Sequence, residues 1–171
     1  EILKRLTLNP VEEDEFIDKD INIRDYLHEI ISSFKEISKK EFVFNFDQDS
    51  NSKKITKSIE LVYGLRNFIG NANKFAKNTI FINLKSDSEI TEITVEDDGD
   101  GYPRDIISKI GEPYLKSNYS KDKSKEGLGL GLFIGKTLLE KNFASVNCRN
   151  SKTRNGAEVV IRWKNKELFN I

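Results

Sequence analysis

Two periods of hydrophobic residues run through this chain and separate helices from strands. Helical spacing of apolar residues over 21–37 and 57–76, and an apolar run over 128–142, predict three helices. Alternation of apolar and polar residues predicts five strands, over 41–47, 79–87, 89–97, 144–151 and 157–163. The segment 105–110 is predicted to be a short further helix. Because a sheet must bury one face against another layer, this pattern is typical of an α/β (α+β) two-layer sandwich.

The composition indicates one folded domain without a general attraction to nucleic acid. The 171 residues include 28 basic and 28 acidic side chains, so the formal net charge is zero. Aromatic residues make up 10% of the chain, which favours a packed core. No apolar run approaches the roughly 18 residues that span a bilayer. With no signal peptide at its start, we expect a cytoplasmic domain. Cys148 is the single cysteine, and we expect it half-buried on a strand.

The first residues suggest a piece of a longer protein. The chain begins with Glu1 and contains no methionine. Residues 1–10 are predicted to be the end of a helix that Asn9 and Pro10 stop, and the acidic residues 11–20 a linker. We assign residues 21–165 to the folded domain and 166–171 to a C-terminal tail.

Three glycines, Gly127, Gly129 and Gly131, alternate with leucines at the start of the predicted helix 128–142. A P-loop would need a glycine at Leu130, and a dinucleotide-binding motif one at Leu132. The remaining interpretation is a helix N-terminus whose unpaired N–H groups attract an anion, with glycines that let a phosphate approach. Close packing against a neighbouring element is the alternative, and this segment by itself leaves both open.

Polar residues upstream favour the phosphate. Asn67 and Asn71 lie four residues apart, so they share one face of a predicted helix. An amide oxygen suits Mg²⁺, and Lys74, one turn further along, is able to reach the same phosphates. A solvated polar face is the alternative interpretation.

An acidic turn, Asp97-Asp98-Gly99-Asp100-Gly101, follows a predicted strand. A carboxylate at this place is able to accept a hydrogen bond from an exocyclic amine such as that of adenine. An acidic turn without a ligand is the alternative. A calcium loop starting at Asp98 is excluded, because Tyr102 and Pro103 stand where an oxygen ligand and a glycine are needed.

Four motifs in this order resemble those of the ATP-binding catalytic domain of sensor histidine kinases, in the superfamily shared with DNA gyrase and MutL. The segments 67–75, 97–101, 111–114 and 127–132 resemble the N, G1, F and G2 boxes. Within the family, GEPY, the ending KFA and NGAEVVIRW look most like the RegB/PrrB redox-sensing branch. The chain departs from the pattern at Gly70, at Leu128 and at Asn142-Phe143-Ala144, where Glu, Thr and His-Gly-Gly are usual.

The resemblance implies a Bergerat-type fold, a mixed sheet on about three helices, with ATP and Mg²⁺ between the N-box helix and a lid. It implies that Asp97 binds the adenine amine and that Asn71 holds Mg²⁺. Lys74 would contact phosphate, and one of the lid lysines Lys116, Lys121, Lys123 and Lys125 the γ-phosphate. The implied catalytic residues are Asn67, Asn71 and Lys74. The implied ATP-binding residues are Asn71, Lys74, Phe75, Asp97, Gly99, Gly101, Tyr114, Lys116, Ser117, Gly127, Leu128, Gly129, Leu130, Gly131 and Leu132.

Asn67 stands where hydrolytic relatives such as gyrase carry a Glu that activates water. An amide is no base, so we expect weak ATP hydrolysis and transfer to an imidazole. His28-Glu29 resembles the start of a phosphoacceptor motif, but Ile30 and Ile31 do not continue it. We therefore expect the acceptor on a dimerisation hairpin that ends with residues 1–10.

The resemblance also implies the partners. They are the hairpin domain of the same protein and a response regulator, with no nucleic acid, in a membrane-anchored homodimer of the bacterial inner membrane. Two alternatives remain: a serine kinase of the anti-sigma-factor type, and a scaffold module that has lost its nucleotide.

Overall fold

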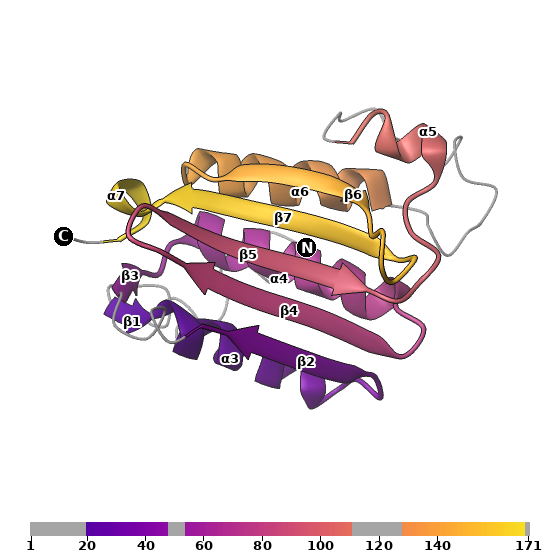
Figure 1. The fold of residues 1–171 in the computed structure, drawn as a ribbon, viewed down its shortest axis with the longest axis horizontal. Coiled ribbons are helices and arrows are strands. Elements are labelled where there is room, and N and C mark those ends of the chain that lie inside the picture. Colours follow the sequence, from indigo (N-terminus) through magenta and orange to yellow (C-terminus); the bar gives the residue numbers. More distant parts are fainter. Residues whose placement is uncertain (1–19, 48–53, 111–127, 170–171) are drawn as a thin grey trace, which may run out of the picture.

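A computed structural model describes residues 20–47, 54–110 and 128–169, which form a mixed five-stranded sheet covered by helices (Figure 1). The strands are β1 (Asp20–Asn22), β2 (Glu41–Phe46), β3 (Lys54–Thr56), β4 (Thr79–Ser86), β5 (Ile90–Asp97), β6 (Ser145–Asn150) and β7 (Ala157–Lys164). The helices are α3 (Ile23–Lys35), α4 (Ile59–Phe75), α5 (Arg104–Ile107), α6 (Leu128–Lys141) and α7 (Asn165–Leu168).

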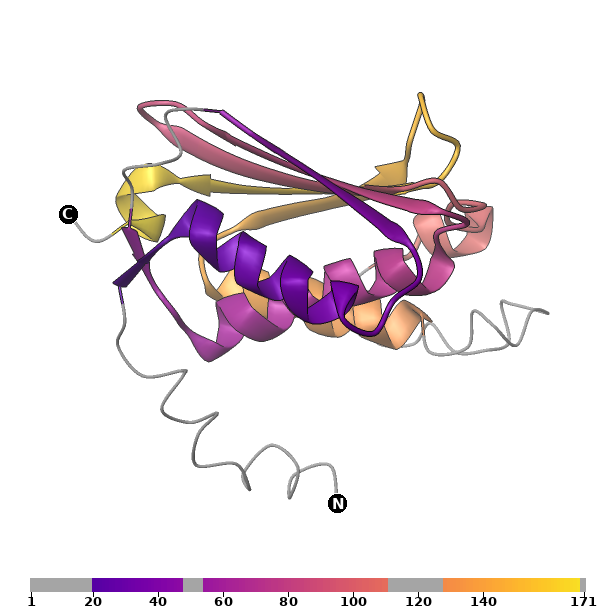
Figure 2. The ribbon, with the colours of Figure 1, turned by 90° about the horizontal axis from the view of Figure 1, so that it is seen from below.

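The large sheet has the strand order β2-β4-β5-β7-β6. Strand β2 runs parallel to β4, and the other neighbouring pairs are antiparallel, which makes the sheet mixed. Helices α3, α4 and α6 lie side by side on one face of it (Figure 2). The predicted fold class, a two-layer sandwich with about three helices, is therefore confirmed.

The core lies between the sheet and these helices. Alternate residues of the central strands point inward and are buried, as the period of two predicts. They include Ile80, Ile82, Leu84, Ile93, Val95, Ile161 and Trp163. Leu65, Phe68 and Ile69 of α4 meet them from the helical layer. The three main helices are thus held mainly by apolar burial.

Polar caps fix where the first two helices begin. The Asn22 side chain accepts a hydrogen bond from Arg24 N at 2.9 Å, and the Ser58 hydroxyl accepts one from Leu61 N at 3.1 Å. Each cap satisfies an N–H group that has no partner within its helix. The helix predicted over 21–37 therefore starts at Ile23, after β1.

Short elements at one end of the molecule were not predicted. Strands β1 and β3 form a two-stranded antiparallel sheet, and Phe169 forms a bridge with Ile55. Leu168, in the segment predicted to be a tail, is in α7 and buried. These elements span only three or four residues, too few for a period to be recognised.

Helices α4 and α6 pack closely through glycines. A Cβ atom on Gly64 would lie 2.5 Å from Leu139 Cγ, and one on Gly135 would lie 2.9 Å from Phe68 Cε2. Both glycines are therefore required by the short distance between the helices. None of the helices described is both long enough and apolar enough to cross a membrane.

Candidate nucleotide-binding site

A pocket opens between α4, the ends of β5 and β7, and the start of α6. It encloses about 400 Å³ of empty space, part of it open to solvent. Its lining is mostly apolar with a few polar groups, as in small-molecule sites. The lining residues are Phe68, Asn71, Ala72, Phe75, Val95, Asp97, Gly101, Tyr102, Leu128, Ala157 and Val159. Three separate sequence motifs therefore meet at one cavity.

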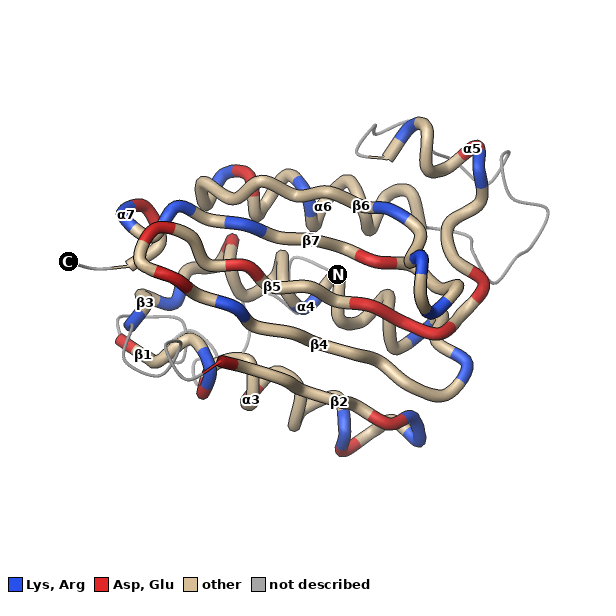
Figure 3. Tube along the Cα trace, in the orientation of Figure 1, with Lys and Arg blue, Asp and Glu red and all other residues tan. Residues whose placement is uncertain are grey.

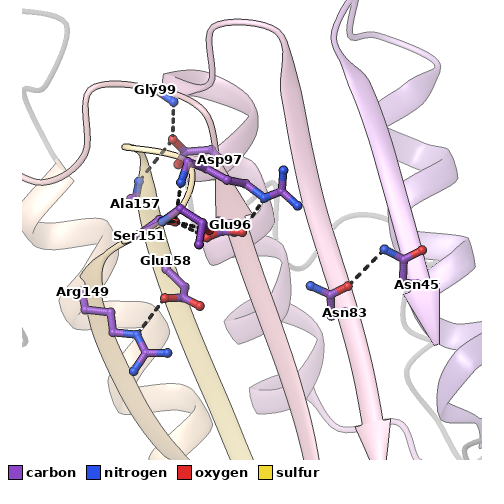
Figure 4. A network of polar contacts seen from close by, with 11 residues as sticks. Asn45, Asn83, Glu96, Asp97, Gly99, Arg149, Ser151, Ala157 and Glu158 are labelled. Carbon is purple, nitrogen blue, oxygen red and sulfur yellow. Dashed lines mark hydrogen bonds and ion pairs between the residues drawn. The ribbon is translucent and has the colours of Figure 1, made fainter. Parts of the chain in front are cut away.

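Asp97 is the buried carboxylate of this pocket, with 3% of its surface exposed. Its Oδ1 accepts hydrogen bonds from Gly99 N at 2.8 Å and from Ala157 N at 3.3 Å (Figure 4). Burial raises the pKa of Asp97 above its ordinary value of 3.8, although these two bonds oppose the shift. Neither bond uses Oδ2, so this oxygen is suited to accept a hydrogen bond from an amine in the pocket.

Two glycines allow close approaches at the acidic turn that begins with Asp97. A Cβ atom on Gly156 would lie 1.9 Å from the Asp97 carbonyl oxygen, and one on Gly99 would lie 2.2 Å from that of Phe75. Gly99, predicted as an ATP-binding residue, thus has a packing reason to be glycine. Gly101, another predicted residue, lines the pocket with a φ of +78°, where a side chain would be strained.

Asp98 has a different role from its neighbour. Its carboxylate accepts hydrogen bonds from the backbone N–H groups of Lys77, Asn78 and Thr79, at 2.8, 3.0 and 3.2 Å. Burial alone would raise the pKa of Asp98, but these bonds outweigh it and lower the pKa. Asp98 therefore fixes the connection from α4 to β4. Figure 3 shows the acidic residues gathered at this end of β5.

Asn71 lines the pocket from α4, whereas Asp97 lines it from the end of β5. Its Nδ2 atom is buried and has no hydrogen-bond partner among the described residues. Such an atom costs about 1–3 kcal/mol unless a ligand pairs with it. Because a half-turn about the last side-chain bond exchanges the two ends of the amide, either the oxygen or the nitrogen can take this position. The site thus fits a phosphate or a hydrated cation.

Asn67 lies beside Asn71 where α4 faces α6. A Cβ atom on Gly131 would lie 3.5 Å from Asn71 Nδ2 and 3.7 Å from Asn67 Oδ1. The structure therefore brings together three of the predicted residues, although Asn67 itself does not line the pocket.

The remaining predicted residues of α4 lie at the mouth of the pocket. Phe75 lines it, whereas Lys74 is exposed, with its ammonium 5.3 Å from the centroid of the Phe75 ring. A cation at the rim is placed to meet a charged group that extends out of the pocket.

The glycine-leucine segment occupies the first turns of α6. Leu128 lines the pocket, Gly129 is buried, Leu130 is 52% exposed, and Leu132 is part of the core. Leu132 is fully buried and does not line the pocket. The other predicted site residues lie outside the described part of the chain. They are Gly127, Tyr114, Lys116, Ser117 and the lysines Lys121, Lys123 and Lys125.

Sequence reasoning missed much of the apolar lining. Phe68, Ala72, Val95, Tyr102, Ala157 and Val159 complete the pocket, and none of them was predicted. Inward positions of the predicted helix and strands would have indicated Phe68, Ala72, Val95 and Val159. Nothing in the local pattern indicates Tyr102, which follows the acidic turn.

The buried carboxylate and the open amide, on a mixed sheet under a helical layer, define a nucleotide-binding domain. The chain belongs to the family of histidine kinase-, DNA gyrase B- and HSP90-like ATPases, which matches residues 56–167. All the predicted site residues from Asn67 to Leu132 fall within this match.

Comparison with individual proteins agrees with the family. Sensor histidine kinase RegB of Cereibacter sphaeroides is 38% identical over 108 residues, which are 60% of this chain and 23% of RegB. Sensor protein RstB of Escherichia coli is 31% identical over 99 residues, or 58% of this chain and 23% of RstB. The predicted similarity to the RegB branch is confirmed. The chain spans less than a quarter of the length of these curated relatives.

Solved structures share the fold. The catalytic domain of histidine kinase ThkA superposes with a TM-score of 0.69 at 18% identity, covering 87% of this chain and 97% of that domain. The structure of full-length ShkA in complex with AMPPNP superposes with a TM-score of 0.70 at 19% identity, covering 90% of this chain and 31% of ShkA.

Proposed function

We propose that this chain is the catalytic domain of a sensor histidine kinase, which binds ATP with Mg²⁺ in the pocket described. The carrying observation is that a buried carboxylate and a buried unpartnered amide atom, on Asp97 and Asn71, line the same cavity. A ligand with an amine at one end and anionic groups at the other matches this pair.

In this proposal the adenine enters between the apolar residues, and its amine donates to Asp97 Oδ2. The phosphates then lie toward Asn71, Gly131 and the rim cation Lys74. Bound Mg²⁺ would neutralise phosphate charge. Asn71 would be the protein's ligand to it, because its amide lines the pocket and an amide oxygen suits Mg²⁺.

The reaction that follows is phosphoryl transfer. The bond from the γ-phosphorus to the bridging oxygen of ADP breaks, and a bond from that phosphorus to an imidazole nitrogen forms. We place the accepting histidine on the hairpin domain of the same protein, and the next acceptor on a response-regulator aspartate. RegB, described above, carries the name of a sensor histidine kinase, which supports a histidine as the acceptor. We also keep the proposal of a membrane-anchored homodimer for the whole protein.

The two alternatives have less support. The relatives described above are named as a sensor histidine kinase and a sensor protein, and neither name supports a serine kinase. In a scaffold without nucleotide, the buried carboxylate of Asp97, with its raised pKa, and the unpaired amide atom of Asn71 would both destabilise the fold with no ligand to compensate.

The first test is a calorimetric titration with a non-hydrolysable ATP analogue and Mg²⁺. Asp97→Asn replaces the charged acceptor with a neutral one. We expect at least tenfold weaker binding of the analogue, which corresponds to a loss of about 1.4 kcal/mol in binding free energy. The matched control is Asp100→Asn, because Asp100 is an exposed acid of the same turn that pairs with Lys77. It is expected to bind like the wild type. Wild-type protein that binds no analogue would favour the scaffold alternative.

A further inference from the structure

The end of β6 holds the loop that follows Asp97. Asn150 is the last residue of β6, and its Oδ1 accepts a hydrogen bond from Tyr102 N at 2.6 Å. Its Nδ2 donates to the Tyr102 carbonyl oxygen at 3.1 Å. One side chain thus pairs with both backbone groups of Tyr102, which fixes the position and the rotation of that residue.

Gly101 is glycine because of this contact. A Cβ atom there would lie 2.7 Å from Asn150 Oδ1 and 3.2 Å from the Asn155 carbonyl oxygen. Its φ of +78° also disfavours a side chain. The second glycine of the acidic turn therefore accommodates the β6–β7 hairpin.

The side chain of Tyr102 also faces the same strand. It is 7% exposed and lines the pocket, and its hydroxyl interacts with the nearby Cys148 thiol of β6. Burial raises the pKa of Tyr102 well above its usual range and that of Cys148 to about 12, so both groups are neutral at physiological pH. Strand β6 therefore fixes the backbone of Tyr102 through Asn150 and lies beside its hydroxyl at Cys148.

The hairpin that carries Asn150 is itself anchored to β5. Glu96, beside Asp97, accepts a hydrogen bond from Arg154 Nε at 2.8 Å. It accepts another from the Ser151 hydroxyl (Figure 4). Arg154 also lies over the Phe81 ring, 3.5 Å from its centroid. Together with the bond from Ala157 N to Asp97, these contacts make the hairpin end a rigid frame for both Asp97 and Tyr102.

We propose that Asn150 is a positioning residue for nucleotide binding: it holds Tyr102 as a preformed wall of the pocket beside Asp97. This inference rests on the proposed function. Because Asn150 does not line the pocket, it acts through Tyr102 and not on the ligand. A fixed wall lowers the cost of ordering the site on binding and restricts which base fits.

The test compares Asn150→Ala with Asn147→Ala in titrations with ATP and GTP analogues. Asn147 is an exposed asparagine on the same strand and is the matched control. We expect Asn150→Ala to bind the ATP analogue about tenfold more weakly and to discriminate less against the GTP analogue. Asn147→Ala should match the wild type. In a Tyr102→Ala background, Asn150→Ala should add no further loss.

A second measurement is independent of ligand. Exchange of the Tyr102 amide hydrogen should be at least tenfold faster in Asn150→Ala than in the wild type, and Asn150→Asp, which keeps only the acceptor, should lie between them. The inference is wrong if Asn150→Ala leaves either the exchange rate or the affinity unchanged. It is also wrong if Asn150→Ala causes the same loss of affinity in the Tyr102→Ala background as in the wild type. Wild-type protein that binds no nucleotide would instead overturn the proposed function.

Discussion

At the scale of single residues, two adjacent carboxylates show opposite electrostatics. Asp97 is buried against apolar residues, so its charge is disfavoured, and its pKa is raised. Asp98 receives three backbone N–H bonds, and its pKa is lowered. Asp98 therefore stabilises the fold, whereas the charge on Asp97 opposes folding and suits binding. Such a conflict between stability and activity is common at functional sites.

These shifts predict how stability depends on pH. The pKa of Asp97 is higher in the folded protein than its ordinary value of 3.8. This group therefore favours folding most below about pH 3.8, and this contribution to stability is lost as the pH rises through the raised pKa. Asp97→Asn removes the buried charge and keeps an acceptor for Gly99 and Ala157. We expect its melting temperature at pH 7 to equal or exceed that of the wild type, although it binds nucleotide poorly.

Asp98→Asn is the matched control for this prediction. The contribution of Asp98 to the stability of the fold is fully present above about pH 3.8 and is lost as the pH falls through its lowered pKa. Its replacement should lower the melting temperature at pH 7 and have little effect in strong acid. Thermal melts of both variants from strong acid to pH 7 measure this. Destabilisation of Asp97→Asn at pH 7 would contradict the account of its buried charge.

At the scale of elements, the contact between α4 and α6 uses glycines for different purposes. Gly64 and Gly135 leave no room for a side chain, because Leu139 and Phe68 occupy the space. Gly131 faces Asn71 at an ordinary contact distance: a Cβ atom there would lie 3.5 Å from Nδ2, so an alanine would fit. The first two glycines serve packing, and the third borders the proposed phosphate site.

A pair of substitutions separates the two purposes. We expect Gly135→Val to destabilise the protein by about 2–3 kcal/mol through overpacking. Gly131→Ala should leave stability unchanged or raise it by up to about 1 kcal/mol, since alanine favours helix. The same variant should bind the ATP analogue several-fold more weakly, because its methyl group would lie against Asn71. Urea denaturation and titration measure the two effects. Full affinity in Gly131→Ala would place the phosphates elsewhere.

At the scale of the whole molecule, the pocket and the only histidine of the sequence are separate. His28 is exposed on α3, and its ring packs edge-on against Phe44 and Phe46, with centroids 4.8 and 5.9 Å apart. It does not line the pocket. The chain therefore has the groups to hold a nucleotide, and we place the acceptor on another domain.

This separation predicts the behaviour of the chain with labelled ATP. We expect slow hydrolysis, because Asn67 is no base, and no label on the chain itself. Label should appear on a separately prepared hairpin domain of the same protein. His28→Gln is the control and should change neither result. Label on the chain that disappears in His28→Gln would show that His28 is the acceptor, and rapid hydrolysis in both wild type and Asn67→Ala would contradict the role given to Asn67.

The sequence by itself determined the main helices and strands, since their periods of hydrophobicity reflect which local face is buried. It also indicated Asn71, Asp97 and the glycine segment of α6, because their order and spacing resemble a known family. Family membership and the fold class followed from these local patterns and are confirmed by the comparisons.

Tertiary structure alone decided how these parts meet. Asn150 and Tyr102 are 48 positions apart, and Gly156 approaches Asp97 from the turn that precedes β7. The sequence indicated a role for Asp97 but none for Asp98, whose three backbone partners only the structure shows. Strands β1 and β3 form through pairing with each other. The physical reason is common to all of them: hydrogen bonding and close packing between distant segments leave no period in the local sequence.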